Sequence, residues 1–221
     1  MDLKICTDGS MRNFENGRSF GCAGAIAIDS MQTMYRIIPD TTNNRCELMA
    51  IYLGVKLAQE IVCSSPLYDS ITIYSDSQFS VYGLNKWMYS WLRYSDKSGT
   101  LYNKKGSKVA NQELYKLIIK FIIDNGLRIK FMLQQGHTDL NKQESVRSAI
   151  IRFKNENGVD IDFSTLYNII SFNNIVDTTT RNKLKNLDLN DYPVDGYLTK
   201  ENDYDYMNNY RIPKYFNNYI L

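Results

Sequence analysis

Residues 70–76 constrain the fold of this chain more than any other stretch. They read Ser-Ile-Thr-Ile-Tyr-Ser-Asp, an alternation of apolar and polar residues that ends in the carboxylate of Asp76. Alternation with β-branched and aromatic residues is typical of a strand. A strand that ends in an acid just before a helix presents a ligand group to the crevice of an α/β sheet. The stretch therefore predicts an α/β domain with an acidic site at the end of a strand.

The same pattern appears at the beginning of the chain, where residues 3–7 alternate and are followed by Asp8 and Gly9. Taken alone, an Asp before a Gly is more typical of a turn. Further alternating stretches predict strands, and apolar residues at helical spacing predict helices between them. This order predicts a mixed sheet with helices on both faces. The predicted strands cover 21–29, 34–38 and 128–133, and the predicted helices cover 46–62, 78–91 and 111–125, with a further helix opening at about 172.

Two more acids lie where helices are predicted to begin. Glu47 falls in the first turn of the helix over 46–62, and Asp177 falls in the first turns of the last helix. An acid in a first turn already has a simple explanation, because it complements the positive end of the helix dipole. The ends of these elements can nevertheless converge with Asp8 and Asp76 at one crevice. Carboxylates without a set of His or Cys partners favour Mg²⁺.

The net charge does not exclude any class of binding partner, because 26 Lys and Arg oppose 24 Asp and Glu and leave a net charge of +2. One local cluster stands out over residues 93–108, with two Tyr between its cations and Trp87 and Trp91 just before it. Cations interleaved with aromatic residues are typical of a nucleic-acid surface, although a solvated loop is the simpler reading of a charge run. The cations are Arg93, Lys97, Lys104, Lys105 and Lys108.

The remaining composition is that of a soluble globular chain, with 43% hydrophobic residues. No apolar run approaches the roughly 20 residues of a membrane span, and the acid at position 2 argues against a secretory signal. The four cysteines are scattered, so we expect buried free thiols in a reducing, cytoplasmic compartment. We also expect a monomer without a membrane partner. Residues 186–221 are rich in Tyr, Asn and Asp and predict a loosely packed extension.

Four short motifs in this order resemble the type-1 ribonuclease H family. They are Thr7-Asp8-Gly9-Ser10, the string Thr-Thr-Asn-Asn-Arg-Cys-Glu-Leu-Met-Ala over 41–50, Ser75-Asp76-Ser77-Gln78, and Gly136-His137. The resemblance covers roughly residues 2–137 and 173–185. It implies a ribonuclease H-like α/β fold with a five-stranded mixed sheet. It also implies an endonuclease that hydrolyses the RNA strand of RNA–DNA hybrids and leaves 5′-phosphate and 3′-hydroxyl ends.

The resemblance also implies roles for individual residues. Asp8, Glu47, Asp76 and Asp177 would hold two Mg²⁺ ions about 4 Å apart, with Mn²⁺ as a substitute, and His137 would assist proton movement or product release. Asn43, Asn44 and Gln78 would contact the RNA strand near its 2′-hydroxyls. The segment from Trp87 to Lys108 would be the basic protrusion that grips the DNA strand, through Trp87, Trp91, Lys97, Lys104, Lys105 and Lys108.

The chain departs from the family after His137. Asn174-Ile-Val-Asp177 fits the pattern of the fourth acid, but Asp177 lies 40 residues after His137 (177 − 137). We therefore interpret 138–172 as an insertion within a catalytic core formed by 1–137 and 173–185, and 186–221 as an extension that could bind a protein partner. Asp139 is the competing fourth ligand. A junction resolvase of the same superfold and a non-catalytic hybrid-binding module are the alternative functions.

Overall fold

The computed structural model describes residues 1–15, 17–65, 67–191 and 204–221, apart from the side chain of residue 190. Five strands form one mixed sheet in the order β3-β2-β1-β4-β5. The first three strands are antiparallel, whereas β4 is parallel to both β1 and β5. The predicted five-stranded mixed sheet is therefore confirmed. The strands are β1 (Asp2–Asn13), β2 (Ser19–Ala27), β3 (Thr33–Pro39), β4 (Ser70–Ser75) and β5 (Ile129–Leu133).

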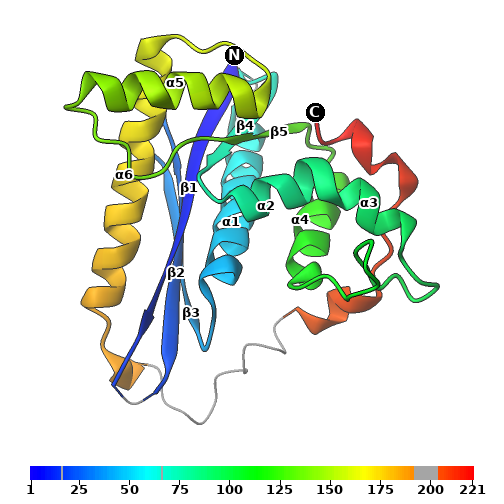
Figure 1. The fold of residues 1–221 in the computed structure, drawn as a ribbon. Coiled ribbons are helices and arrows are strands. Elements are labelled where there is room, and N and C mark those ends of the chain that lie inside the picture. The colour runs from blue at the N-terminus through cyan, green and yellow to red at the C-terminus, as the bar shows by residue number, and fades with distance from the viewer. Residues whose placement is uncertain (16, 66, 192–203) are drawn as a thin grey trace.

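Helices cover both faces of this sheet, as Figure 1 shows. Alternate residues of β1 point to opposite faces, because successive side chains of a strand do so. Leu3 and Ile5 pack with α1 (Asn43–Ser64), whereas Cys6 packs with α6 (Phe163–Lys185). The sheet thus separates a large core, shared with α1 and α4 (Gln112–Asp124), from a smaller core under α5 (Gln143–Asn157) and α6.

The predicted helix over 78–91 is divided into three parts. A π-helical turn, η1 (Gly83–Trp87), separates α2 (Gln78–Tyr82) from α3 (Met88–Arg93). A π-turn inserts an extra residue, so side chains after it lie on a different face from the one that simple helical spacing predicts.

The last long helix begins earlier than predicted. α6 starts at Phe163, where the side chain of Asp162 accepts a hydrogen bond from the Thr165 N–H at 2.9 Å. The expectation that Asp177 opens a helix is therefore wrong, because Asp177 lies in the second half of α6. Residues 138–172 comprise α5 and the first part of α6, and this helix continues without a break across the boundary at 172. Their interpretation as an insertion stays a prediction.

The C-terminal segment, residues 204–221, packs more closely than predicted. It contains two short 3₁₀ turns, η3 (Asp205–Asn209) and η4 (Lys214–Asn218). Its apolar side chains at Met207, Phe216 and Ile220 are buried in the larger core. The prediction of a loosely packed extension is wrong for these residues. Pro193 and its neighbours in the predicted extension lie outside the described residues.

The expectation of buried free thiols is confirmed for Cys6, Cys22 and Cys46 and is wrong for Cys63, which is exposed near the end of α1. Within the part of the chain that the structure describes, we find no helix with the length and apolar character needed to cross a membrane.

Candidate active site

The register of two parallel strands places Asp8 beside Asp76. β1 and β4 pair in parallel as far as Thr7 opposite Ser75, and the next residue on each strand is an aspartate. Asp8 does not end its strand as expected, because β1 continues to Asn13 along β2. It lies at the level where β4 ends. The carboxyl end of β4 therefore exposes two neighbouring carboxylates on the same face of the sheet.

Glu47 reaches these aspartates because α1 approaches β1 closely at Gly9. A Cβ at Gly9 would lie 2.4 Å from the carbonyl carbon of Cys46 and 2.5 Å from the amide nitrogen of Glu47. The N–H of Gly9 donates a hydrogen bond to Glu47 Oε2 at 3.2 Å. The missing side chain thus allows the first turn of α1 to bring its acid onto the sheet.

The three carboxylates form one compact group. One oxygen from each of Asp8, Glu47 and Asp76 lies within 4.8 Å of the others. Asp8 is 5% exposed and Glu47 is 7% exposed, so water screens their charges poorly. The group lines a cavity of about 400 Å³. Its other lining residues include Ser10, Arg12, Asn43, His137, Asp177 and Arg181.

One face of α6 closes the cavity from the other side. Asn173, Asp177, Thr180 and Arg181 recur at the spacing of successive helical turns, so they share a face. The Asn173 side chain donates a hydrogen bond to Asp76 Oδ2 at 3.4 Å. The Thr180 hydroxyl lies 3.4 Å from Asp8 Oδ2 and 2.7 Å from the hydroxyl of Ser10. α6 is therefore tied to both strands that carry the central acids.

Asp177 faces the cavity, whereas Asp139 does not. Asp177 Oδ1 accepts a hydrogen bond from Arg181 Nε at 2.6 Å, and both side chains line the cavity. Asp139 forms an ion pair with Lys142 at 3.2 Å and caps the turn that contains Asn141. Asp139 is absent from the cavity lining. The structure thus brings Asp177, and not Asp139, to the three central carboxylates.

Burial and mutual repulsion perturb the protonation of the group. Burial, reinforced by the charges of Asp76 and Asp177, raises the pKa of Asp8 from its ordinary 3.8 to about 7. Burial and the charges of Asp8 and Asp76 also raise the pKa of Glu47 well above its usual range. Burial raises the pKa of Asp76, opposed by the hydrogen bond from Asn173. Without a cation, the group is held in an unfavourable state.

The donors in this cavity suit a hard divalent cation. All three grouped ligand atoms are carboxylate oxygens, with a fourth carboxylate at Asp177 beside them. Mg²⁺ and similar ions prefer oxygen ligands, and a divalent charge would stabilise the ionised carboxylates against the burial and the mutual repulsion that raise their pKa values. The residues present therefore fit a divalent metal centre.

His137 lies at the rim of this cavity. It is exposed, lines the cavity and has a left-handed backbone with φ of 51°. Its charge lowers the pKa of Asp76, so the imidazole is close enough to act on this carboxylate electrostatically. The lone histidine of the chain is thus placed beside the acids.

The three predicted RNA-contacting amides lie at the beginnings of two helices. Asn43 and Asn44 are exposed in the first turn of α1, and Asn43 lines the cavity. Gln78 is exposed as the first residue of α2, two positions after Asp76. All three amides are therefore free to meet a ligand that spans the carboxylates.

The two tryptophans differ in exposure. Trp87 is 37% exposed and packs edge-on to the ring of Tyr82. Trp91 is 7% exposed, and the centroid of its ring lies 5.2 Å from that of the Tyr115 ring. The ring of Trp91 thus lies in the larger core, and its contact with nucleic acid stays a prediction. The π-turn between α2 and α3 changes the face on which it lies.

The loop of the predicted basic protrusion, residues 95–110, is held by side-chain hydrogen bonds. The Asp96 side chain accepts hydrogen bonds from the Ser98 and Thr100 N–H groups, both at 2.9 Å. The backbone N–H of Leu101 is bound at 2.8 Å by the side chain of Gln112, the first residue of α4. Side-chain caps thus hold the loop in one shape. Its four lysines are exposed, and within the described residues none forms an ion pair: Lys97, Lys104, Lys105 and Lys108.

Sequence reasoning missed Asn173, Thr180 and Arg181 as site residues. A signal for them was present, because they recur with Asp177 at helical spacing. This spacing could be interpreted only with the correct start of α6. A helix that begins near 172 does not show which of its faces packs on the sheet.

Comparisons with known proteins identify the family of this chain. The model of the RNase H family matches residues 1–149, more than half of the chain. The chain therefore belongs to the RNase H family, and the predicted relation to its type-1 members is confirmed. The match ends before Asp177.

Several curated relatives are similar over part of their length. Ribonuclease HI of Haemophilus ducreyi is 35% identical over 98 residues, which are 44% of this chain and 55% of that protein. Ribonuclease H of Prochlorococcus marinus strain NATL2A is 29% identical over 115 residues, 52% of this chain and 64% of that protein. The chain thus spans somewhat more than half the length of these relatives.

Two solved structures are also similar to the chain. LC9-RNase H1, described as a type 1 RNase H with the type 2 active-site motif, is 18% identical with a TM-score of 0.45 and covers 74% of this chain and 79% of its own. LC11-RNase H1 in complex with RNA/DNA hybrid is 18% identical with a TM-score of 0.45, over 68% of this chain and 97% of that one.

Proposed function

We propose that the protein is an endonuclease that hydrolyses the RNA strand of RNA–DNA hybrids. One observation carries the proposal: three carboxylates from separate elements, with oxygens within 4.8 Å, line an open cavity in a chain of the RNase H family. Buried like charges cost stability unless a cation neutralises them, so such a group is expected to serve a function.

Asp8, Glu47 and Asp76 would hold the divalent metal, with Asp177 as the fourth carboxylate. We infer two Mg²⁺ ions, which Mn²⁺ could replace, because four acids provide more negative charge than one divalent ion neutralises. When bound, the ions would activate the attacking water and stabilise the leaving oxygen. The expected products carry 5′-phosphate and 3′-hydroxyl ends. This chain's own part is to hold the four acids in place through the Gly9 contact and the hydrogen bonds from α6.

The choice of strand would come from residues around the cavity. The amides of Asn43, Asn44 and Gln78 can both donate to and accept from a 2′-hydroxyl, which DNA lacks. The lysines of the basic protrusion would contact phosphates of the second strand. His137, at the rim of the cavity, would assist proton movement or product release.

Three further properties belong to this proposal. The free thiols of Cys6, Cys22 and Cys46 favour a reducing compartment, which we take to be the cytoplasm. We expect the protein to act as a monomer. Residues 1–137 with 173–185 would form the catalytic core.

Cleavage of labelled duplexes tests the function. We expect the protein with Mg²⁺ to cut the RNA strand of a hybrid and to leave duplex DNA intact, and we expect EDTA to stop the reaction. Asp8→Asn keeps the shape of the side chain and removes its charge, so it should abolish cleavage and leave hybrid binding intact. Preferred cutting of a four-way DNA junction would identify a resolvase instead. Hybrid binding without any cleavage would identify a binding module.

A further inference from the structure

The C-terminal segment, residues 204–221, is anchored along one side of the catalytic core. Its last residues extend the sheet, because the Ile129 N–H donates to the Tyr219 carbonyl at 2.8 Å and the Leu221 N–H donates to the Ile129 carbonyl at 2.9 Å. Farther back, the buried Lys116 of α4 donates from Nζ to the Asn208 carbonyl at 2.6 Å. Backbone bonds and buried contacts therefore fix both ends of the segment.

Apolar side chains hold the middle of the segment against α3 and α4. Ile212 is 9% exposed and Phe216 is 3% exposed within the larger core. The centroid of the Phe216 ring lies 5.1 Å from that of the Tyr89 ring in α3. Burial of this size fixes the path of the backbone between the anchors. The polar residues of the segment are thus presented in defined positions.

The segment meets the basic protrusion at Gly99. A Cβ at Gly99 would lie 2.9 Å from Cγ of Arg211 and 3.1 Å from the Tyr210 carbonyl oxygen. Gly99 also has φ of 91°, which side chains other than glycine rarely adopt. A cavity of about 260 Å³ lies between the two, lined by Asp96, Gly99 and Leu101 of the protrusion and by Arg211 and Lys214. Protrusion and segment therefore form one continuous surface.

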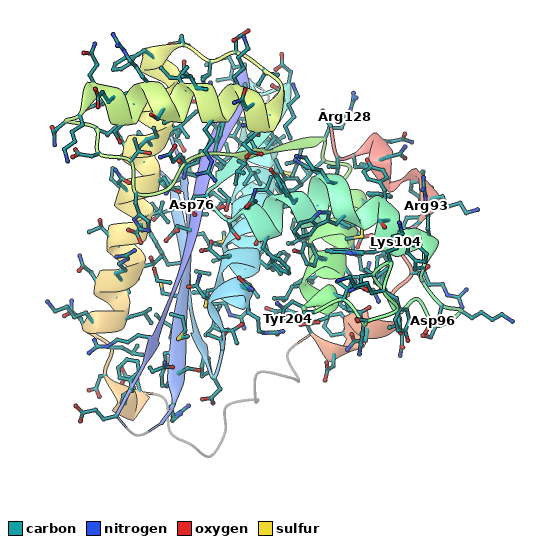
Figure 2. All side chains as sticks on the ribbon, in the orientation of Figure 1. Asp76, Arg93, Asp96, Lys104, Arg128 and Tyr204 are labelled. Atoms are coloured by element: carbon teal, nitrogen blue, oxygen red, sulfur yellow. The ribbon has the colours of Figure 1, made fainter. Side chains whose placement is uncertain are left out.

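Two cations of the segment add to this surface. Arg211 and Lys214 are exposed, and in the described part of the chain neither takes part in an ion pair. The one acid that lines the cavity, Asp96, is already bound by the Ser98 and Thr100 N–H groups. Figure 2 shows Arg93, Asp96 and Lys104 on the side of the molecule that the C-terminal segment also occupies. The positive charge of the protrusion thus continues into Arg211 and Lys214.

We propose that Arg211 and Lys214 bind phosphates of the hybrid beyond those reached by the basic protrusion. This inference rests on the proposed function, which it extends to a segment that the family model does not match. The stem of Arg211 lies close to Gly99, and its guanidinium is exposed and can pair with a phosphate through two hydrogen bonds. The contacts would be sequence-independent, because phosphates carry no sequence information.

Salt dependence of hybrid binding tests the proposal. The test variant is Arg211→Gln with Lys214→Gln, measured in an Asp8→Asn background so that the hybrid is not cut. The matched control is Arg147→Gln with Arg152→Gln, which removes the same net charge from exposed positions of α5, on a different side of the molecule (Figure 1). Thermal unfolding verifies that both variants fold, which we expect because the four side chains are exposed.

The expected result is a smaller salt slope for the test variant alone. Each phosphate contact contributes about 0.9 to the slope of log K against log salt, so two lost contacts lower it by about 1.8. The fall in affinity between about 50 and 200 mM salt would then be about twelvefold smaller than in the parent.

An unchanged slope and affinity in the test variant would overturn the inference and would leave a protein partner as the ligand of this surface. An equal change in the control variant would overturn it as well, because the effect would then come from net charge. Failure of the proposed function would look different, since the parent with Asp8 intact would then leave the RNA strand of the hybrid uncut, whether or not it binds the hybrid.

Discussion

Substitution of Gly9 by alanine should displace Glu47 while leaving all four acids of the active site unchanged. The new Cβ would lie 2.4 Å from the carbonyl carbon of Cys46 and 2.5 Å from the amide nitrogen of Glu47. Unstrained carbon contacts are about 3.5 Å or longer, so the first turn of α1 would have to move away by about 1 Å. Both partners are backbone atoms at the start of a long, packed helix. No side-chain rotation can relieve the contact.

The movement should affect stability and activity differently. Insertion of a methyl group into a packed core costs about 1–3 kcal/mol in the free energy of unfolding. Glu47 moves with its backbone and loses the Gly9 hydrogen bond at 3.2 Å. A displacement of about 1 Å in a catalytic group lowers the rate by about 100-fold. We therefore expect Gly9→Ala to fold, to bind divalent metal more weakly and to cut hybrid about 100-fold more slowly.

Three measurements on two variants decide the outcome. Urea unfolding gives the free energy, calorimetry gives the affinity for Mn²⁺, and single-turnover cleavage at saturating metal gives the rate. The control is Gly126→Ala, because Gly126 has φ of 62° and no atom within 4 Å of a new Cβ. This control should cost about 1–2 kcal/mol from backbone strain alone and keep full activity. Parental metal affinity and turnover in Gly9→Ala would refute the reasoning.

Two other predictions follow from the same site. Asp177→Ala should lower cleavage by orders of magnitude and raise the Mg²⁺ requirement, whereas Asp139→Ala should be mild; the reverse order in a metal titration would assign the fourth ligand to Asp139. The metal-free protein should lose stability as the pH rises from about 4 to about 7. The pKa of Asp8 is raised from 3.8 to about 7 in the folded state. The folded state therefore binds more protons than the unfolded state in this pH range, and raising the pH favours unfolding. Asp8→Asn should flatten this dependence in urea unfolding, and an equally steep curve in the variant would show that other groups cause it.

The sheet and the positions of two central acids could be predicted from local patterns in the sequence. Asp8 and Asp76 each follow an alternating stretch, and residues that follow parallel strands meet at the same edge of a sheet. Glu47 could be placed at the start of a helix because apolar residues recur at helical spacing after it. These features depend on near neighbours in the chain, which a local pattern can report.

The sequence favoured Asp177 over Asp139 only through the short pattern Asn174-Ile-Val-Asp177. The position of Asp177 beside the other acids depended on the tertiary structure. α6 begins at Phe163 and packs across β1 and β2, which places the Asp177 face of the helix over the carboxylates. Packing between distant segments fixed both the position and the rotation of this helix. The same holds for Arg181 and Asn173.

The exposure of Trp91 and the position of the C-terminal segment were also decided only in three dimensions. A π-turn at Gly83–Trp87 changed the face on which Trp91 lies and turned its ring toward Tyr115. Residues 204–221 look polar and irregular in sequence, yet a few apolar side chains and the free edge of β5 were enough to fix them on the core. The composition of a segment does not show where it packs, because residues far away in the chain form the surface that it contacts. The physical reason is that burial and edge pairing depend on which surfaces the rest of the fold leaves open.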